Sequence, residues 1–132
     1  MPGEVWTTEA YHEYLRNRAK KKTKYNNQKV EYNGFVFDSK REYNRYLILL
    51  SMEQQGEIAD LEVHPKFHLL DSKKWHGQTI PKKSYSADFR YTQNGRIIVE
   101  DVKSPATQKD KTYRLKRHLF LVKHPNVDFY EV

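Results

Sequence analysis

The segment that most restricts the fold is a pair of alternating runs, SYSADFRY and RIIVEDVK, joined by Asn94-Gly95. Asn-Gly is the strongest short-range signal for a two-residue hairpin turn, because both turn positions need positive φ. The first run alternates an apolar face with a polar face that carries Asp88, and the second run begins as a buried strand. The sequence therefore predicts two neighbouring strands, the second of which ends in the polar residues Asp101 and Lys103.

These polar residues suggest a site. Side chains alternate along a strand, so Asp101 and Lys103 should point the same way, about 6 to 7 Å apart, while Glu100 points the other way. If the strands pair with the polar faces together, Asp88 joins them. Carboxylates this close repel one another, which favours a divalent cation between them, and the backbone carbonyl of Val102 is a suitable further ligand for Mg²⁺. Lys103 could then orient or deprotonate a water that the metal has acidified, and phosphodiester hydrolysis needs this set of parts.

The charge of the chain favours a polyanionic partner. The formal net charge is +7, so the surface attracts nucleic acid. The absence of cysteine is typical of a reducing compartment, and no apolar run approaches the roughly 18 residues of a membrane span. We expect a soluble, cytoplasmic protein that does not bind membranes.

The first 28 residues form a basic N-terminal arm that is predicted to contain a helix. Residues 1–29 carry seven cations against three anions, which accounts for +4 of the net charge. The arm is either a solvated terminus or a strap for a phosphate backbone. The candidate phosphate-binding residues are Lys20, Lys21, Lys22 and Lys24.

The remaining pattern predicts a mixed α/β domain over residues 29–132, with helices covering a central sheet. In chain order the expected elements are a hairpin at residues 28–38 turning at Asn33-Gly34, a helix at 40–55, a strand at 61–70 with an edge or bulge at Pro65, a loop or wide hairpin tip at 71–83, the two strands described above, a helix at 107–123 and a strand at 127–132. On the last helix, Arg114, Lys116 and Arg117 are either solvated or contact phosphates.

Several segments together resemble a known family. Asp88 in SADF followed by DVK in VEDVK resembles the bipartite signature of the PD-(D/E)xK nucleases, the restriction-endonuclease-like superfamily. The segments YNNQKVEYNGFVFDSKREYNRY, LEVHPKFHL, YSADF, VEDVK and YRLKRHLF, in this order, resemble small phage and prophage proteins placed in that superfamily. The resemblance covers about residues 25–132 and implies a restriction-endonuclease-like mixed sheet flanked by helices, in a phage or prophage protein that acts in the cytoplasm of a bacterial host.

The resemblance also implies roles for single residues. Asp88 and Asp101 would be metal ligands, Lys103 the catalytic lysine, and Glu42 the additional acidic residue that many members use near the metal. Glu42 fits equally well in a capping box with Ser39. Two residues depart from the expected pattern: Ala87 stands in place of proline, and His64 in place of a glutamine, which leaves the role of that position open.

Two classes of function compete. The leading hypothesis is a Mg²⁺- or Mn²⁺-dependent DNA endonuclease, with branched or junction DNA as a candidate substrate and a homodimer as the economical way to make two cuts. The alternative is a basic DNA- or RNA-binding accessory protein without catalysis, which would gain nothing from carboxylates that face phosphates. A nuclease acting on RNA fits the same residues. Glu100 could replace Asp101 as a ligand if the strand carried a bulge; otherwise we expect it to pair with the basic last helix.

Overall fold

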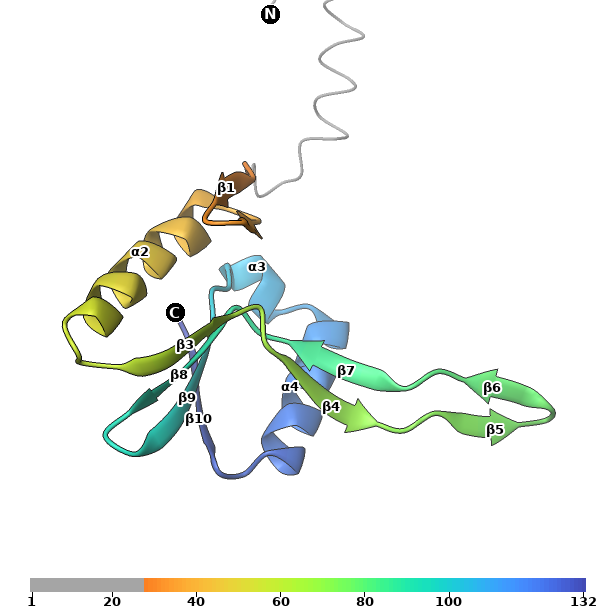
Figure 1. Ribbon diagram of the computed structural model, residues 1–132. Helices are drawn as coiled ribbons and strands as arrows, with labels where there is room; N and C mark the ends of the chain where they lie inside the picture. Colours follow the sequence, from red (N-terminus) through yellow and green to blue (C-terminus); the bar gives the residue numbers. More distant parts are fainter. Residues whose placement is uncertain (1–27) are drawn as a thin grey trace, which may run out of the picture. The chain divides into compact units, whose positions relative to one another are not determined.

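The computed structural model describes residues 28–132, which form a mixed α/β fold with three helices and four sheets (Figure 1). The chain divides into two units, Met1–Lys40 and Arg41–Val132. The predicted arm and its lysines lie outside the described residues, so the boundary at residue 28 stays a prediction. The elements are β1 (Val30–Tyr32), β2 (Phe35–Phe37), α2 (Lys40–Gln54), β3 (Ala59–Val63), β4 (Lys66–Leu70), β5 (Lys73–Trp75), β6 (Gln78–Ile80), β7 (Lys83–Ser86), β8 (Phe89–Gln93), β9 (Arg96–Asp101), α3 (Pro105–Gln108), α4 (Lys111–Lys123) and β10 (Val127–Glu131).

Both Asn-Gly turns form as predicted. Asn33 and Gly34 have φ values of 54° and 81°, and they join β1 to β2 in the first unit. Asn94 and Gly95, with φ values of 53° and 78°, join β8 to β9 in the second unit. Each turn has positive φ at both central residues, as a type I′ hairpin requires.

The largest sheet of the second unit has the strand order β10-β9-β8-β3. β8 is antiparallel to both β9 and β3, whereas the C-terminal β10 runs parallel to β9, so the sheet is mixed. The β8–β9 ladder pairs Phe89 with Glu100 and Arg90 with Val99. The ladder ends at the Phe89–Glu100 pair, and the Asp88 N–H donates to the Glu100 carbonyl at 3.1 Å.

Two predicted strands are each interrupted. The expected strand 61–70 divides into β3 and β4, and the SYSADFRY run divides into β7 and β8. The breaks lie side by side: the His64 N–H donates to the Asp88 carbonyl at 2.9 Å, and the Ala87 N–H donates to the Pro65 carbonyl at 3.0 Å. The predictions of single strands were therefore wrong, because the chain leaves the main sheet here and continues as a separate β4–β7 pair.

The two long helices of the second unit cover different groups of core residues. Tyr46 of α2 stacks on Phe89, with ring centroids 6.4 Å apart. A cluster of buried residues joins α4 to β4, β7 and β9; it comprises Phe67, Leu69, Tyr85, Ala87, Val99, Tyr113 and Phe120. Because Val99 and Glu100 are neighbours on β9 and point to opposite faces, α4 covers one face of the strand and α2 the other.

The predicted helix 107–123 is two helices. α3 ends at Gln108, and Asp110 begins α4 as its N-cap, its side chain accepting from the Tyr113 N–H at 2.8 Å. An aspartate at this position satisfies a backbone donor that the first helical turn leaves unpaired. Among residues 28–132, each helix is too short or too polar to cross a bilayer.

Glu100 has a structural partner. It is 2% exposed and accepts two hydrogen bonds from the Arg45 guanidinium, at 2.7 and 2.6 Å, and one from the Tyr91 hydroxyl. Its ion pair is thus made with α2, and the expected pairing with the last helix was wrong. The reason is strand parity: Glu100 faces α2, whereas α4 lies on the opposite face.

Replacing Arg45 by methionine should destabilise the fold strongly. The change leaves the Glu100 carboxylate buried without its cation, and we expect the free energy of unfolding in urea to fall by about 3 kcal/mol. In the double variant Arg45→Met/Glu100→Gln, the neutral amide keeps a partner in Tyr91, so most of that loss should be recovered. An Arg45→Met protein as stable as the parent would show that the pair is not structural.

Candidate functional site

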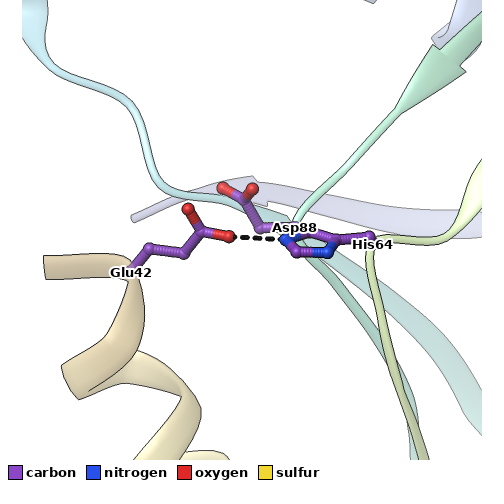
Figure 2. Close-up of side chains that lie close together, drawn as sticks. All are labelled: Glu42, His64 and Asp88. Carbon is purple, nitrogen blue, oxygen red and sulfur yellow. Dashed lines mark hydrogen bonds and ion pairs between the residues drawn. The ribbon is translucent and has the colours of Figure 1, made fainter. Parts of the chain in front are cut away.

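Three side chains from separate elements converge in the second unit. Glu42 comes from the first turn of α2, His64 from the link between β3 and β4, and Asp88 from the link between β7 and β8 (Figure 2). One ligand atom from each residue lies within 4.8 Å of the other two. His64 Nε2 is 2.9 Å from Glu42 Oε2, and the Glu42 side chain is 5% exposed.

The two strand breaks position these side chains. His64 has a φ of 57°, a left-handed conformation that is uncommon outside glycine, and it directly precedes Pro65. The hydrogen bond from its backbone to Asp88 fixes the two breaks side by side. The Asp88 carboxylate is held in turn by the Val102 N–H, which donates to Oδ2 at 2.7 Å. Backbone contacts thus set the separation of the imidazole and the carboxylate.

Asp101 and Lys103 form a second group. Lys103 Nζ is 3.5 Å from Asp101 Oδ1 and 4.9 Å from the ring centroid of Tyr113. The other carboxylate oxygen, Oδ2, accepts from the Tyr85 hydroxyl. Asp101 is fully buried, and its Oδ1 has no hydrogen-bond partner among residues 28–132. The lysine lies above an aromatic ring and beside a buried carboxylate, which restricts where its ammonium group can reach.

Burial raises the pKa values of both aspartates. The pKa of Asp88 rises to about 7 because the carboxyl is desolvated and lies beside Glu42; the Val102 N–H and the Lys103 ammonium oppose the rise. Burial likewise raises the pKa of Asp101 to about 6, again against the effect of Lys103. Lys103 therefore acts on both carboxylates, and it links the two groups electrostatically. Each carboxylate would gain from additional positive charge.

The donor set fits a divalent metal ion. Glu42 and Asp88 offer carboxylate oxygens, His64 offers an imidazole nitrogen, and the three atoms are close enough to share one ion. Carboxylates suit Mg²⁺ and Mn²⁺, and an imidazole is a common ligand of transition metals. The buried Oδ1 of Asp101 is ion-paired with Lys103 at 3.5 Å and lies outside this three-residue group. A metal ion at the three-residue group would offset the repulsion between its two carboxylates.

Comparison with known proteins gives a family. Residues 22–131 match the family described as "Protein of unknown function (DUF1064)". The chain belongs to the DUF1064 family. A search of curated proteins finds no match, and neither does a search of solved structures.

The predicted site residues of this DUF1064 chain fall into two places. Glu42 and Asp88 lie together with His64. Asp101 lies beside Lys103, as the alternation of side chains along the strand predicted, and it is outside the three-residue group. Val102 contacts Asp88 through its N–H, and a ligand role for its carbonyl stays a prediction. Glu100 is held by Arg45.

His64 is the site residue to which the sequence assigned no role. The available signal was its place beside Pro65 in a strand-like run and its departure from the glutamine of the resembling proteins. Neither shows that residue 64 lies beside Glu42 and Asp88, because that contact depends on the two strand breaks lying side by side.

The predicted phosphate-binding cations of α4 differ in their surroundings. Arg117 Nη1 pairs with Glu131 at 2.9 Å, and its guanidinium carbon lies 5.5 Å from the Tyr113 ring centroid. Arg114 is exposed and Lys116 is half-buried. Contact with phosphates stays a prediction for all three, and Lys20, Lys21, Lys22 and Lys24 lie outside the described residues.

The stability of the metal-free protein should fall as the pH rises, and Asp88→Asn should reduce that dependence. The folded protein holds the Asp88 proton up to about pH 7, whereas an aspartate in the unfolded chain loses it near pH 3.8, its ordinary pKa. Folding is therefore favoured at low pH, and this stability is lost between about pH 4 and pH 7. Asparagine mimics the protonated carboxyl and does not titrate. The free energy of unfolding of the variant, minus that of the parent, should therefore be larger at pH 8 than at pH 4 by on the order of a few kcal/mol.

The measurement is urea unfolding in EDTA across this pH range. Asp60→Asn, at an exposed position on β3, is the matched control and should follow the parent. Parallel pH profiles for the parent and Asp88→Asn would contradict the raised pKa of Asp88.

Proposed function

We propose that this protein is a Mg²⁺- or Mn²⁺-dependent endonuclease that hydrolyses DNA phosphodiester bonds in a restriction-endonuclease-like fold. The observation that carries the proposal is the convergence of Glu42, His64 and Asp88 next to a buried aspartate–lysine pair. The mixed sheet between two helices and the order of the resembling segments support the same superfamily. Branched or junction DNA is the candidate substrate.

Each residue has a role in the proposal. Glu42, His64 and Asp88 would hold the metal ion, and Asp101 anchors Lys103 through the ion pair at its Oδ1. The bound ion supplies Lewis-acid chemistry, lowering the pKa of a water and neutralising charge on phosphate.

Lys103 has the role of placing positive charge at the attacked phosphate and orienting the nucleophilic water. Its position between the carboxylate of Asp101 and the ring of Tyr113 limits the orientations of its ammonium group. A preorganised cation stabilises the charge that develops in phosphoryl transfer without a cost of reorganisation.

A non-catalytic binding protein explains these residues less well. The net charge of +7 would serve either function. Buried carboxylates with raised pKa values cost stability, however, and they repel phosphates unless a cation lies between them. Because residues 28–132 carry one such site, we propose that duplex cleavage on both strands uses a homodimer.

Incubation of supercoiled plasmid and of a four-way junction with the protein and Mg²⁺ or Mn²⁺ should give nicked or cut products. EDTA should abolish the cleavage, and Lys103→Ala or Asp88→Asn should lower the rate by at least about 100-fold, the scale of a positioned catalytic group. Lys109→Ala, at an exposed lysine, should cleave as the parent does. Binding without cleavage in any metal would favour the accessory function, and cleavage in EDTA would refute the mechanism. Matched RNA substrates tell a ribonuclease from a deoxyribonuclease.

Direct metal binding should depend on His64. Titration of Mn²⁺, followed by the loss of its free-ion EPR signal, should give weaker binding for His64→Ala by about 10-fold or more, on the scale of disturbing a metal's ligand surroundings. Glu42→Gln should weaken binding too, whereas His118→Ala, on the exposed surface of α4, should not. Equal affinity for the parent and His64→Ala would remove the imidazole from the site, whatever the outcome of cleavage assays.

A further inference from the structure

An exposed hairpin extends the β4–β7 pair. β5 and β6 lie beyond the ends of β4 and β7 (Figure 1), and every residue from Leu70 to Lys83 is exposed. Within this segment Trp75 is 58% exposed and Ile80 is 39% exposed. Neither side chain packs into the core, so both are available for contact with a partner. The sequence predicts a loop or a wide hairpin tip at residues 71–83, and the structure has a hairpin there.

The hairpin presents Trp75 in a defined way. His76 and Gly77, with φ values of 49° and 75°, form a tight turn that pairs Trp75 with Gln78 and Lys73 with Ile80. Trp75 therefore shares a strand face with Lys73 and Ile80. On the other face Lys74 Nζ donates to the Thr79 hydroxyl at 2.7 Å. The His76 ring meets the indole edge-on, with centroids 4.7 Å apart.

The charge of the hairpin has one sign. Residues 71–83 contain four lysines and one acidic residue, Asp71, for a net charge of +3. Asp71 lies 2.9 Å from the His68 imidazole. The lysines, all exposed, are Lys73, Lys74, Lys82 and Lys83. An aromatic ring between lysines is the combination by which proteins bind single-stranded nucleic acid, since bases stack on the ring and cations contact the phosphates.

We propose that the β5–β6 hairpin is a DNA-binding arm on which an unpaired base stacks against Trp75 while lysines of the hairpin contact the adjoining phosphates. A protein partner is less well matched, because Trp75 and Ile80 are the two large apolar residues of β5 and β6, and they share their face with the polar Lys73 and Gln78. The inference rests on the proposed function for the identity of the polymer, and it deepens that function by naming the substrate: DNA with unpaired bases.

Trp75 supplies its own spectroscopic probe. The chain has two tryptophans, so Trp6→Phe leaves Trp75 as the single indole. In EDTA, where the proposed cleavage does not occur, titration with an oligothymidine strand or a forked duplex should quench the Trp75 emission, and a blunt duplex should quench it much less. Labelled DNA followed by anisotropy gives the affinity in the same samples.

Variants separate stacking from charge. Trp75→Ala should weaken binding of the single strand by roughly 10-fold, and Trp75→Phe should restore most of it. Lys73→Gln/Lys74→Gln should reduce the slope of log affinity against log salt concentration by up to about 1.4, because each lost phosphate contact reduces it by about 0.7. Lys109→Gln/Lys111→Gln removes the same charge from exposed positions outside the hairpin and should leave the slope closer to that of the parent. Tyr130→Ala is the control for an exposed aromatic residue, 50% exposed on β10.

The outcomes distinguish the two proposals. DNA that binds by anisotropy without changing Trp75 emission, or a Trp75→Ala protein with parental affinity, overturns the arm. Equal quenching of the Trp75 emission by blunt duplex and by single-stranded DNA overturns the claim that an unpaired base stacks on Trp75. If the parent cleaves DNA and the Trp75 and lysine variants bind as the parent does, the endonuclease proposal stands and the DNA-binding arm is refuted. If binding depends on Trp75 but no cleavage occurs, the arm stands and the endonuclease proposal is refuted. Unchanged thermal unfolding of Trp75→Ala shows that its effect is not a folding defect, as expected for a side chain outside the core.

Discussion

The pairing of β8 with β9 is the constraint on which the second unit depends. Its register, Phe89 opposite Glu100, places Phe89 under α2 and brings Asp88 to the end of β9, where its N–H donates to the Glu100 carbonyl. A slip by one residue would exchange the two faces of β9, burying Val99 against α2 and turning Glu100 toward the apolar cluster under α4. The tight turn at Asn94-Gly95 fixes this register locally, so the chemistry at one end of the hairpin is set by backbone geometry at the other.

Adjacent acidic residues on β9 are stabilised in different ways. Glu100 is compensated by Arg45 with two short hydrogen bonds, which makes it part of the fold. Asp101, one residue further, has a lysine at 3.5 Å and an oxygen without a hydrogen-bond partner among the described residues, and burial raises its pKa to about 6. A carboxylate that the fold leaves incompletely compensated costs stability, and such groups concentrate at functional sites. This contrast separates the structural acid from the candidate functional one better than sequence position does.

Local signals in the sequence predicted much of the fold. Both hairpin turns, the helix from residue 40, the C-terminal strand and the shared side of Asp101 and Lys103 follow from turn chemistry and periodicity, which act over a few residues. The breaks did not follow, because alternation continues through them: Tyr85, Ala87, Phe89 and Tyr91 are all buried, as a single strand predicts. Tyr85 and Ala87 pack in the cluster under α4, whereas Phe89 packs on α2. Which helix covers which residue is decided by tertiary structure and leaves no trace in the alternation.

The break at Asp88 also explains how the site can form. In an unbroken strand, Asp88 would share a face with Ser86 and Arg90 and be held at the spacing of the pleat. Leaving the ladder between Ser86 and Phe89 frees the carboxylate to approach Glu42 on α2 while its Oδ2 stays bonded to the Val102 N–H. The matching break puts His64, with positive φ, at the same level. An acidic side chain and an imidazole thus leave regular pairing together and meet a helix, and this is why a pattern read one strand at a time could find Asp88 without finding His64.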